Sequence, residues 1–139
     1  MYKINKKALK VATRLMGDET KAINYFEKLS NWDAEFSKLT QEFGWAGMYA
    51  RDILDDRTRE LIAVAALTVL GKLPQLKGHI EMALQVGATT KEIMEVMLQL
   101  VVFAGYPTAL NGLSALEEVS VGKLENDKGP NHETSKLGW

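Results

Sequence analysis

Two apolar segments, residues 61–70 and 93–103, constrain the fold of this chain more than any other feature. Each is apolar at nearly every position, and each is followed by glycine, a short link and proline, in the sequences LGKLP (70–74) and FAGYP (103–107). Glycine commonly ends a helix, and proline is favoured in the first turn of the next helix. The pattern therefore predicts two successive helical hairpins, related as a weak internal repeat.

The rest of the chain is also predicted to be helical, because apolar residues recur at helical spacing and no segment alternates as a strand does. Asp55 or Asp56 is suited to cap the helix that ends at residue 70, and Thr89 with Glu92 forms a T-x-x-E capping box for a later helix. Residues 44–56 interrupt the pattern. We predict an all-α fold with helices over residues 3–16, 20–29, 32–43, 56–70, 74–86, 93–103 and 107–121.

A chain of 139 residues suits one domain. We expect residues 1–121 to form a single helical domain and residues 122–139, which are polar without periodicity and include His132, to form a flexible tail. Helices that are apolar on all sides require burial on all sides, and a small helical monomer can hardly cover two of them. Because a subunit interface is the simplest way to cover them, we predict a homo-oligomer.

Composition and charge exclude several classes of function. The chain has no cysteine, so disulfides, thiolate metal sites, thiol nucleophiles and dithiol redox chemistry are excluded. The net charge is −1, and the one basic run, residues 3–10, fits a solvated helix face, so no nucleic-acid partner is expected. The first residues lack the apolar core of a secretory signal, and no apolar run is long enough for a membrane span. We therefore expect a cytoplasmic protein that does not contact membranes.

The side chain that most invites a chemical role is His79, in the expected helix 74–86 among Leu76, Ile80 and Ala83. An imidazole on an apolar helix face is either a core or interface histidine with one hydrogen bond, or a general acid or base. A carboxylate that orients the ring would favour the catalytic alternative.

Glu60 is the best candidate for that carboxylate, because it lies at the edge of the apolar part of its helix. The short link between the two helices requires them to pack antiparallel. Glu60 lies far from this link and His79 lies near it, so spacing alone does not bring the two together within one hairpin, and whether they meet within one subunit or across an interface stays open. Contact would need a steep helix crossing or a neighbouring subunit. Alternatively, Glu60 is an acid favoured near a helix N-terminus by the helix dipole.

Three arginines, Arg51, Arg57 and Arg59, cluster around the start of the same helix. Guanidinium groups match carboxylates in geometry, so these side chains could bind a carboxylated substrate. The alternative is that they pair with neighbouring acids: Asp52, Asp55 and Asp56.

Glu95 and Gln99 are four residues apart on an otherwise apolar helix. Buried polar groups need hydrogen bonds, so this pair either lines a pocket or fixes a helix contact. Met82, Met94 and Met97 are expected to fill the core. The chain has two histidines, neither with a second ligand at helical spacing, so no metal site is predicted.

Three segments resemble the carboxymuconolactone decarboxylase family: LDDRTRELIAVAAL (54–67), LKGHIEMALQVGATTKEIMEVMLQL (76–100) and VFAGYPTALNGL (102–113). They occur in the family's order and spacing, within residues 45–119. The resemblance implies a bundle of helical hairpins of the alkylhydroperoxidase D-like type. It also implies homo-oligomers, commonly trimers or hexamers.

One branch of this superfamily reduces peroxides with a C-x-x-C-x-x-x-H motif and a glutamate on the preceding helix. Its histidine matches His79 and its glutamate matches Glu60, but the cysteine positions are occupied by Lys72 and Gln75. Because the thiols are absent, a dithiol peroxidase reaction has no nucleophile here, and an antioxidant role is disfavoured.

The decarboxylase branch lacks the cysteine pair and keeps the histidine. Resemblance to it implies decarboxylation of 4-carboxymuconolactone in aromatic catabolism, without a cofactor, because the unsaturated lactone accepts the electrons released with CO2. His79 would donate a proton or a hydrogen bond, and Glu60 would orient it. Arg51 or Arg59 would bind a substrate carboxylate. Aromatic side chains would wall the pocket: Trp45, Tyr49 and Tyr106.

Two other functions remain open on the sequence. One is an enzyme of the same fold with a different substrate. The other is an oligomeric helical scaffold or binding protein without activity, which would be favoured if Glu60 were remote from His79.

Overall fold

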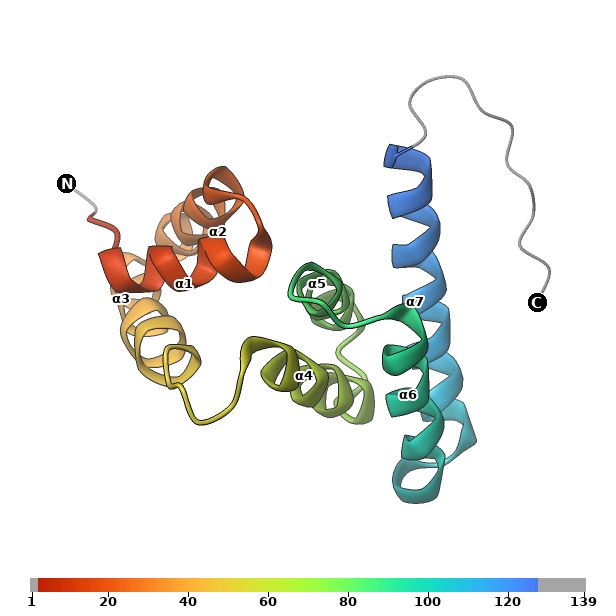
Figure 1. Ribbon diagram of the computed structural model, residues 1–139. Helices are drawn as coiled ribbons and strands as arrows, with labels where there is room; N and C mark the ends of the chain where they lie inside the picture. Colours follow the sequence, from red (N-terminus) through yellow and green to blue (C-terminus); the bar gives the residue numbers. More distant parts are fainter. Residues whose placement is uncertain (1–2, 128–139) are drawn as a thin grey trace.

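The computed structural model describes residues 3–127, with side chains as far as residue 122. Within this range the chain is helical and contains no strand, which confirms the all-α prediction. In chain order the elements are α1 (Lys6–Met16), α2 (Glu19–Trp32), α3 (Ala34–Leu39), the π-helical η1 (Thr40–Tyr49), α4 (Asp56–Leu70), α5 (Leu73–Gln85), α6 (Thr90–Ala104) and α7 (Tyr106–Asp127) (Figure 1).

The helices form two groups, each with its own core. The N-terminal group, α1 to η1, packs together at one end of the molecule, and the α6–α7 hairpin lies at the other, with the α4–α5 hairpin between them (Figure 1). Met82 of α5 reaches into the first core, and Met97 belongs to the second, as expected for methionines that fill a core. The first core comprises Ala8, Val11, Ala12, Leu15, Ala22, Phe26, Trp45 and Met82. The second is centred on Val64, Leu76, Ile80, Ala83, Ile93, Met97 and Leu116.

Several helix ends follow the predicted signals. Asp55 is the residue that caps α4, since the Thr58 N–H donates to Asp55 Oδ1 at 2.7 Å. Thr89 and Glu92 form the predicted capping box at the start of α6, with hydrogen bonds of 3.1 and 2.8 Å. Gly71 ends α4 with a φ of 68°, a left-handed conformation that glycine adopts without strain.

The boundary between the second and third helices differs from the prediction. The sequence suggested that residues 30–31 separate them, but α2 continues to Trp32. Asp33 performs both functions at this point: it ends α2, and its Oδ1 accepts from the Phe36 N–H at 2.7 Å to cap α3. The side chain of Asp33 therefore separates α2 from α3, in place of residues 30–31.

The predicted break over residues 44–56 begins later, because the π-helix η1 runs through both of its glycines to Tyr49. At Gly47 an added Cβ would lie 2.9 Å from the carbonyl oxygen of Glu42, so a larger residue would disturb this turn. Here glycine accommodates a wide helical turn instead of ending a helix, and the true link to α4 is residues 50–55.

The last helix also extends further than expected. We predicted its end near residue 121 and a flexible tail from residue 122, but α7 continues to Asp127. Residues 128–139, including His132, lie outside the described residues.

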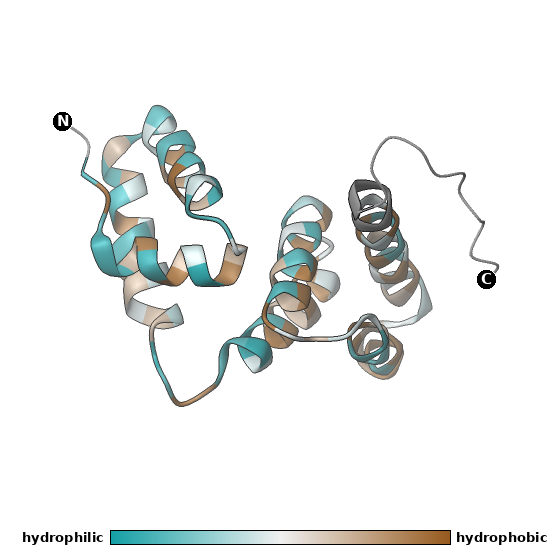
Figure 2. Cartoon of the chain, turned by 45° about the horizontal axis from the view of Figure 1, so that its top comes forward, coloured by the Kyte–Doolittle hydropathy of each residue, from teal (hydrophilic) through white to brown (hydrophobic). Residues whose placement is uncertain are grey.

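The prediction that residues 61–70 and 93–103 are buried on all sides is wrong for the single chain. In α4 the fully buried side chains lie along one face: Glu60, Val64 and Thr68. The opposite side exposes Ile62 and Val69, and Val102 on α6 is 79% exposed. Figure 2 shows hydrophobic positions on several sides of these hairpins. None of the helices in residues 3–127 combines the length and the apolarity that crossing a bilayer requires.

Candidate active site

Glu60 and His79 meet within one chain. Glu60 Oε2 lies 2.7 Å from His79 Nδ1, the Glu60 side chain is fully buried, and the His79 side chain is 24% exposed. The sequence left open whether they meet within one subunit or across an interface, and the structure places the contact within the α4–α5 hairpin. Glu60 lies ten residues before the end of α4, and His79 lies six residues after the start of α5. The offset of about 6 Å along the helix axes is short enough for the two side chains to bridge.

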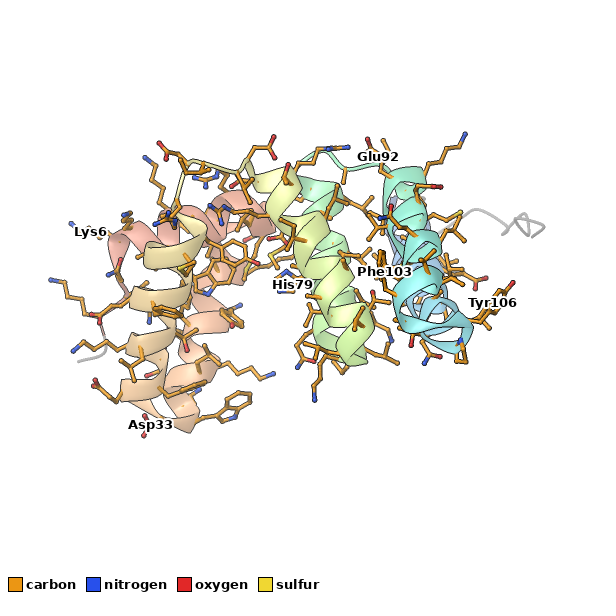
Figure 3. The ribbon with its side chains drawn as sticks, turned by 90° about the horizontal axis from the view of Figure 1, so that it is seen from below. Lys6, Asp33, His79, Glu92, Phe103 and Tyr106 are labelled. Carbon is orange, nitrogen blue, oxygen red and sulfur yellow. The ribbon has the colours of Figure 1, made fainter. Side chains whose placement is uncertain are left out.

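The hydrogen bond defines which imidazole nitrogen is available for chemistry. Nδ1 is occupied by Glu60, so Nε2 is the nitrogen that can reach a bound molecule. Figure 3 shows His79 on the side of the α4–α5 hairpin that faces the N-terminal helices, where its ring is partly exposed. A carboxylate that holds one nitrogen and leaves the other free is the arrangement used where histidine transfers protons.

Tyr49, the last residue of η1 in the N-terminal group, interacts with Glu60 of this pair. Burial, followed by the charge of Glu60 and a hydrogen-bonding interaction with it, raises the pKa of Tyr49 well above its ordinary value, while the charge of Arg59 acts in the opposite direction. The phenol therefore keeps its proton at neutral pH. Its interactions with Glu60 and Arg59 link η1 to the first turns of α4.

Trp45 does not wall an open pocket, because its side chain is only 8% exposed and belongs to the first core. It packs against Tyr49, with ring centroids 5.5 Å apart, and so restricts the movement of that ring. Tyr25 completes the cluster, 5.8 Å from Trp45 in an edge-on arrangement. Tyr25 was not among the predicted site residues, because no spacing pattern in the sequence connects α2 with η1.

The arginines divide into different roles. Arg59 donates from Nη2 to the Arg51 carbonyl oxygen at 3.0 Å, and its buried Nε has no partner within the described residues. Arg51 is exposed and holds Arg59 through its main chain. Arg57 instead forms an ion pair with Glu92 on α6.

The predicted pairing of these arginines with the neighbouring aspartates is not what the structure shows. The carboxylate of Asp55 caps α4, and the hydrogen bonds of Thr58 lower the pKa of Asp55. Asp56 pairs with Arg14 of α1 at 2.6 Å, which raises the pKa of Arg14. This ion pair joins the N-terminal group to the first turn of α4, close to Glu60 in the chain.

Three other predicted residues lie away from the pair. Tyr106 is 67% exposed at the start of α7, on the far side of the hairpins from His79 (Figure 3), so it does not line the site in its own chain. Glu95 and Gln99 are exposed on α6, so in the single chain they neither line a buried pocket nor form a buried contact. The structure thus brings together Glu60, His79, Tyr49 and Arg59.

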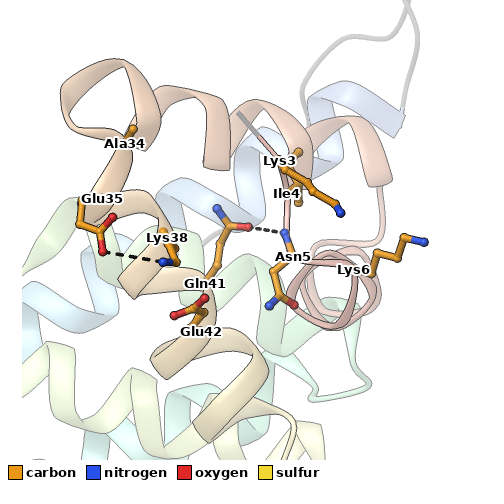
Figure 4. A pocket seen from close by; sticks show the side chains of 9 residues that line it. All are labelled: Lys3, Ile4, Asn5, Lys6, Ala34, Glu35, Lys38, Gln41 and Glu42. Carbon is orange, nitrogen blue, oxygen red and sulfur yellow. Dashed lines mark hydrogen bonds and ion pairs between the residues drawn. The ribbon is translucent and has the colours of Figure 1, made fainter. Parts of the chain in front are cut away.

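A separate hollow lies between the start of α1 and the α3–η1 segment (Figure 4). Its lining mixes charges of both signs, and Gln41 Oε1 accepts from the Asn5 N–H at 2.8 Å across it. The hollow includes none of the residues of the Glu60–His79 pair or its neighbours. Over residues 3–127 no three histidine or acidic side chains converge as metal ligands would.

Comparison of the sequence with known proteins identifies the family of the chain. The chain matches the carboxymuconolactone decarboxylase family over residues 34–118, from α3 into α7, and belongs to that family. It is 30% identical over 115 residues to the 4-carboxymuconolactone decarboxylase of Acinetobacter baylyi, an alignment that covers 82% of this chain and 84% of that protein. The predicted family resemblance is confirmed.

A second relative extends the comparison without adding an activity. The chain is 38% identical over 78 residues to an uncharacterized 15.0 kDa protein in the nqo9-nqo10 intergenic region of Paracoccus denitrificans. That alignment covers 54% of this chain and 58% of the relative.

Proposed function

We propose that this protein is a carboxy-lyase that removes CO2 from a small carboxylated lactone of the 4-carboxymuconolactone type, during cytoplasmic breakdown of aromatic compounds. The observation that carries the proposal is the fully buried Glu60 held 2.7 Å from the partly exposed His79. A buried carboxylate adds little net stability even when it is paired, so its presence here favours a chemical role. The printed activity of the Acinetobacter baylyi relative supports the same reaction class.

The reaction needs three contributions from the protein. The bond between the ring carbon and its carboxylate breaks, CO2 leaves, and the electron pair passes through the conjugated double bond to the lactone carbonyl oxygen. The resulting enolate takes one proton on the carbon next to the carbonyl and becomes an enol-lactone. The protein must therefore bind an anion, stabilise negative charge on the lactone oxygen and deliver a proton.

We assign the last two tasks to His79. Its Nε2 is the free nitrogen, so this atom donates the hydrogen bond or the proton to the reacting molecule. Glu60 fixes the orientation of the ring and balances the positive charge of the protonated imidazole. The unsaturated lactone itself accepts the electrons, so the proposed reaction uses no cofactor.

We assign the anion to Arg59 in preference to Arg51. The guanidinium of Arg59 is held by the Arg51 carbonyl oxygen, and its buried Nε still has a hydrogen to donate. A fixed guanidinium with free donors is suited to a carboxylate. Arg51 contributes its main-chain carbonyl to this arrangement. Its own side chain is exposed, so it is the weaker candidate for binding the substrate carboxylate.

We also propose that the protein acts as a homo-oligomer, a trimer or a hexamer. The support is the set of hydrophobic side chains that a single chain leaves exposed on α4, α6 and α7: Ile62, Val69, Leu70, Leu98, Val102, Phe103, Tyr106 and Leu110. A second copy of the same chain is the occupant that covers such a surface in an oligomer. Val102→Glu should lower the mass found by light scattering, and a wild-type mass equal to one chain would contradict the proposal.

The decarboxylase proposal is tested by following the ultraviolet absorbance of 4-carboxymuconolactone. The wild type should turn the lactone over, and His79→Ala should lower kcat by about 100-fold or more, as expected when a general acid is removed. His132→Ala is the matched control and should behave as the wild type. Absence of turnover by the wild type would exclude this substrate, and full activity of His79→Ala would exclude the assigned role.

A further inference from the structure

Only one of the two carboxylate oxygens of Glu60 has a hydrogen-bond partner within the described residues. Oε2 meets His79, but Oε1 is buried and makes no hydrogen bond of ordinary geometry within the described residues. A buried acceptor without a donor costs about 1–3 kcal/mol, and more when it is charged. A donor close to Oε1 would remove this cost and would also fix the plane of the carboxylate.

Tyr49 carries a hydroxyl that interacts with Glu60. The two side chains interact through charge and hydrogen bonding, and the phenol is partly buried against the first core. The ring is held by Trp45, which lies one turn earlier on η1 at a centroid distance of 5.5 Å. Toward a carboxylate, a protonated phenol can only donate. The Tyr49 hydroxyl is therefore the donor that we consider for Oε1.

We propose that Tyr49 is a positioning residue: its hydroxyl donates to Glu60 Oε1, which leaves Oε2 to hold His79 Nδ1–H and directs His79 Nε2 at the reacting molecule. This role differs from that of a pocket wall, and it rests on the proposed decarboxylation. The partner of a ring nitrogen determines which nitrogen carries the proton, and a group that fixes this partner fixes the tautomer. Without Tyr49, the carboxylate plane is free to turn and the imidazole loses its single orientation.

The first arm of the test compares Tyr49→Phe with Tyr25→Phe. Both remove one hydroxyl from the same aromatic cluster, but Glu60 is not among the groups that act on the Tyr25 phenol. Tyr49→Phe should lower kcat about tenfold with KM within about twofold, because positioning acts on the chemical step. Tyr25→Phe should leave both constants within about twofold of the wild type. Equal behaviour of the two variants would overturn the inference.

The second arm needs no substrate and reads the imidazole directly. Nitrogen-15 spectra distinguish protonated from unprotonated ring nitrogens, and His132→Gln assigns the remaining signals to His79, since the chain has two histidines. At a pH where the imidazole is neutral, the wild type and Tyr25→Phe should show one tautomer with its proton on Nδ1, whose Nε2 is free to take up the proton that it later donates. Tyr49→Phe should show a mixture or exchange broadening. A wild-type spectrum for Tyr49→Phe would overturn the inference whatever its activity.

The two arms also separate this inference from the proposed function. If the wild type does not turn over the lactone, the decarboxylase proposal fails, and the spectra alone decide whether Tyr49 orders His79 through Glu60. If Tyr49→Phe is poorly folded by circular dichroism, 3-fluorotyrosine at position 49 replaces it. This analogue keeps the ring and is a stronger donor, so the Nδ1–H signal should persist or sharpen. Loss of that signal would contradict the proposed hydrogen bond.

Discussion

The N-terminal group and the two C-terminal hairpins differ in how they bury their hydrophobic side chains. Helices α1 and α2 have a capping side chain at the start and one apolar face, and they close a core that includes Phe26 and Trp45. Helices α4 and α6 carry more hydrophobic residues than their own chain covers, including Ile62 and Val102. The first group also exposes hydrophobic side chains, including Trp32 and Phe43, and its core is completed by Met82 of α5. Only in the hairpins do the exposed side chains belong to segments that are apolar at nearly every position.

The candidate site lies where these two regions face each other. Glu60 and His79 come from the α4–α5 hairpin, inside the part of the chain that matches the family. Tyr49 comes from η1, and the ring packing behind it includes Tyr25 of α2, which precedes the matched residues 34–118. We therefore propose that the hairpin supplies the reacting side chains and that the N-terminal group fixes their orientation.

The largest effect should come from the hairpin itself. Glu60→Gln keeps the size of the side chain but removes the charge that balances protonated His79 and fixes its tautomer. We expect kcat for 4-carboxymuconolactone to fall by about 100-fold or more, with KM changed little. Steady-state kinetics on the purified variant would measure this. Activity within about threefold of the wild type would show that the pair is structural.

The next effect tests whether the N-terminal group is stable through its own core. Phe26 is fully buried there, so Phe26→Ala should lower the free energy of unfolding by about 3–5 kcal/mol. Urea denaturation followed by circular dichroism would measure the loss. The matched control is Phe43→Ala, because Phe43 is 74% exposed on η1, and the expected change is below about 1 kcal/mol. Equal losses for both phenylalanines would show that the first core is not where the stability lies.

The smallest effect concerns the cap of α6 and depends on pH. Hydrogen bonds from Thr89, first its backbone N–H, and then the charge of Arg57 lower the pKa of Glu92. A folded pKa below the unfolded one adds stability that is present above the unfolded value, about 4.3, and is lost as the pH falls through the folded value.

Thermal melts between pH 7 and pH 3 would detect this contribution. At pH 7 the Tm of Glu92→Gln should be lower than that of the wild type. On acidification the Tm of the variant should fall by less than the Tm of the wild type. Parallel Tm curves for the two proteins would contradict the assigned hydrogen bonds.

Much of the fold could be predicted from local signals. Glycine and proline set the helix boundaries in residues 70–74 and 103–107, and Thr89 with Glu92 caps the start of α6. These signals act within one helical turn, so their effects do not depend on distant contacts. The break predicted over residues 44–56 was placed too early for the opposite reason, because η1 runs through Gly47 to Tyr49. Whether glycine ends a helix or permits a wide turn depends on the backbone around it, here the carbonyl of Glu42.

The candidate site was predictable in its residues but not in its geometry. Residue types and the family resemblance selected Glu60 and His79, yet helix spacing alone placed them too far apart. A difference of about one turn along two packed helices is bridged by long side chains, which a count of residues does not capture. The position of Tyr49 beside Glu60 depends on how two groups with separate cores dock, and no periodic pattern encodes that.

The most direct test of the account is to measure CO2 release from 4-carboxymuconolactone by the wild type and by His79→Ala, both treated with a metal chelator. We expect the wild type to release one CO2 for each enol-lactone formed, and His79→Ala to release it at least about 100-fold more slowly. Loss of lactone without CO2, or equal release by the two proteins, would contradict a decarboxylase that works through the Glu60–His79 pair.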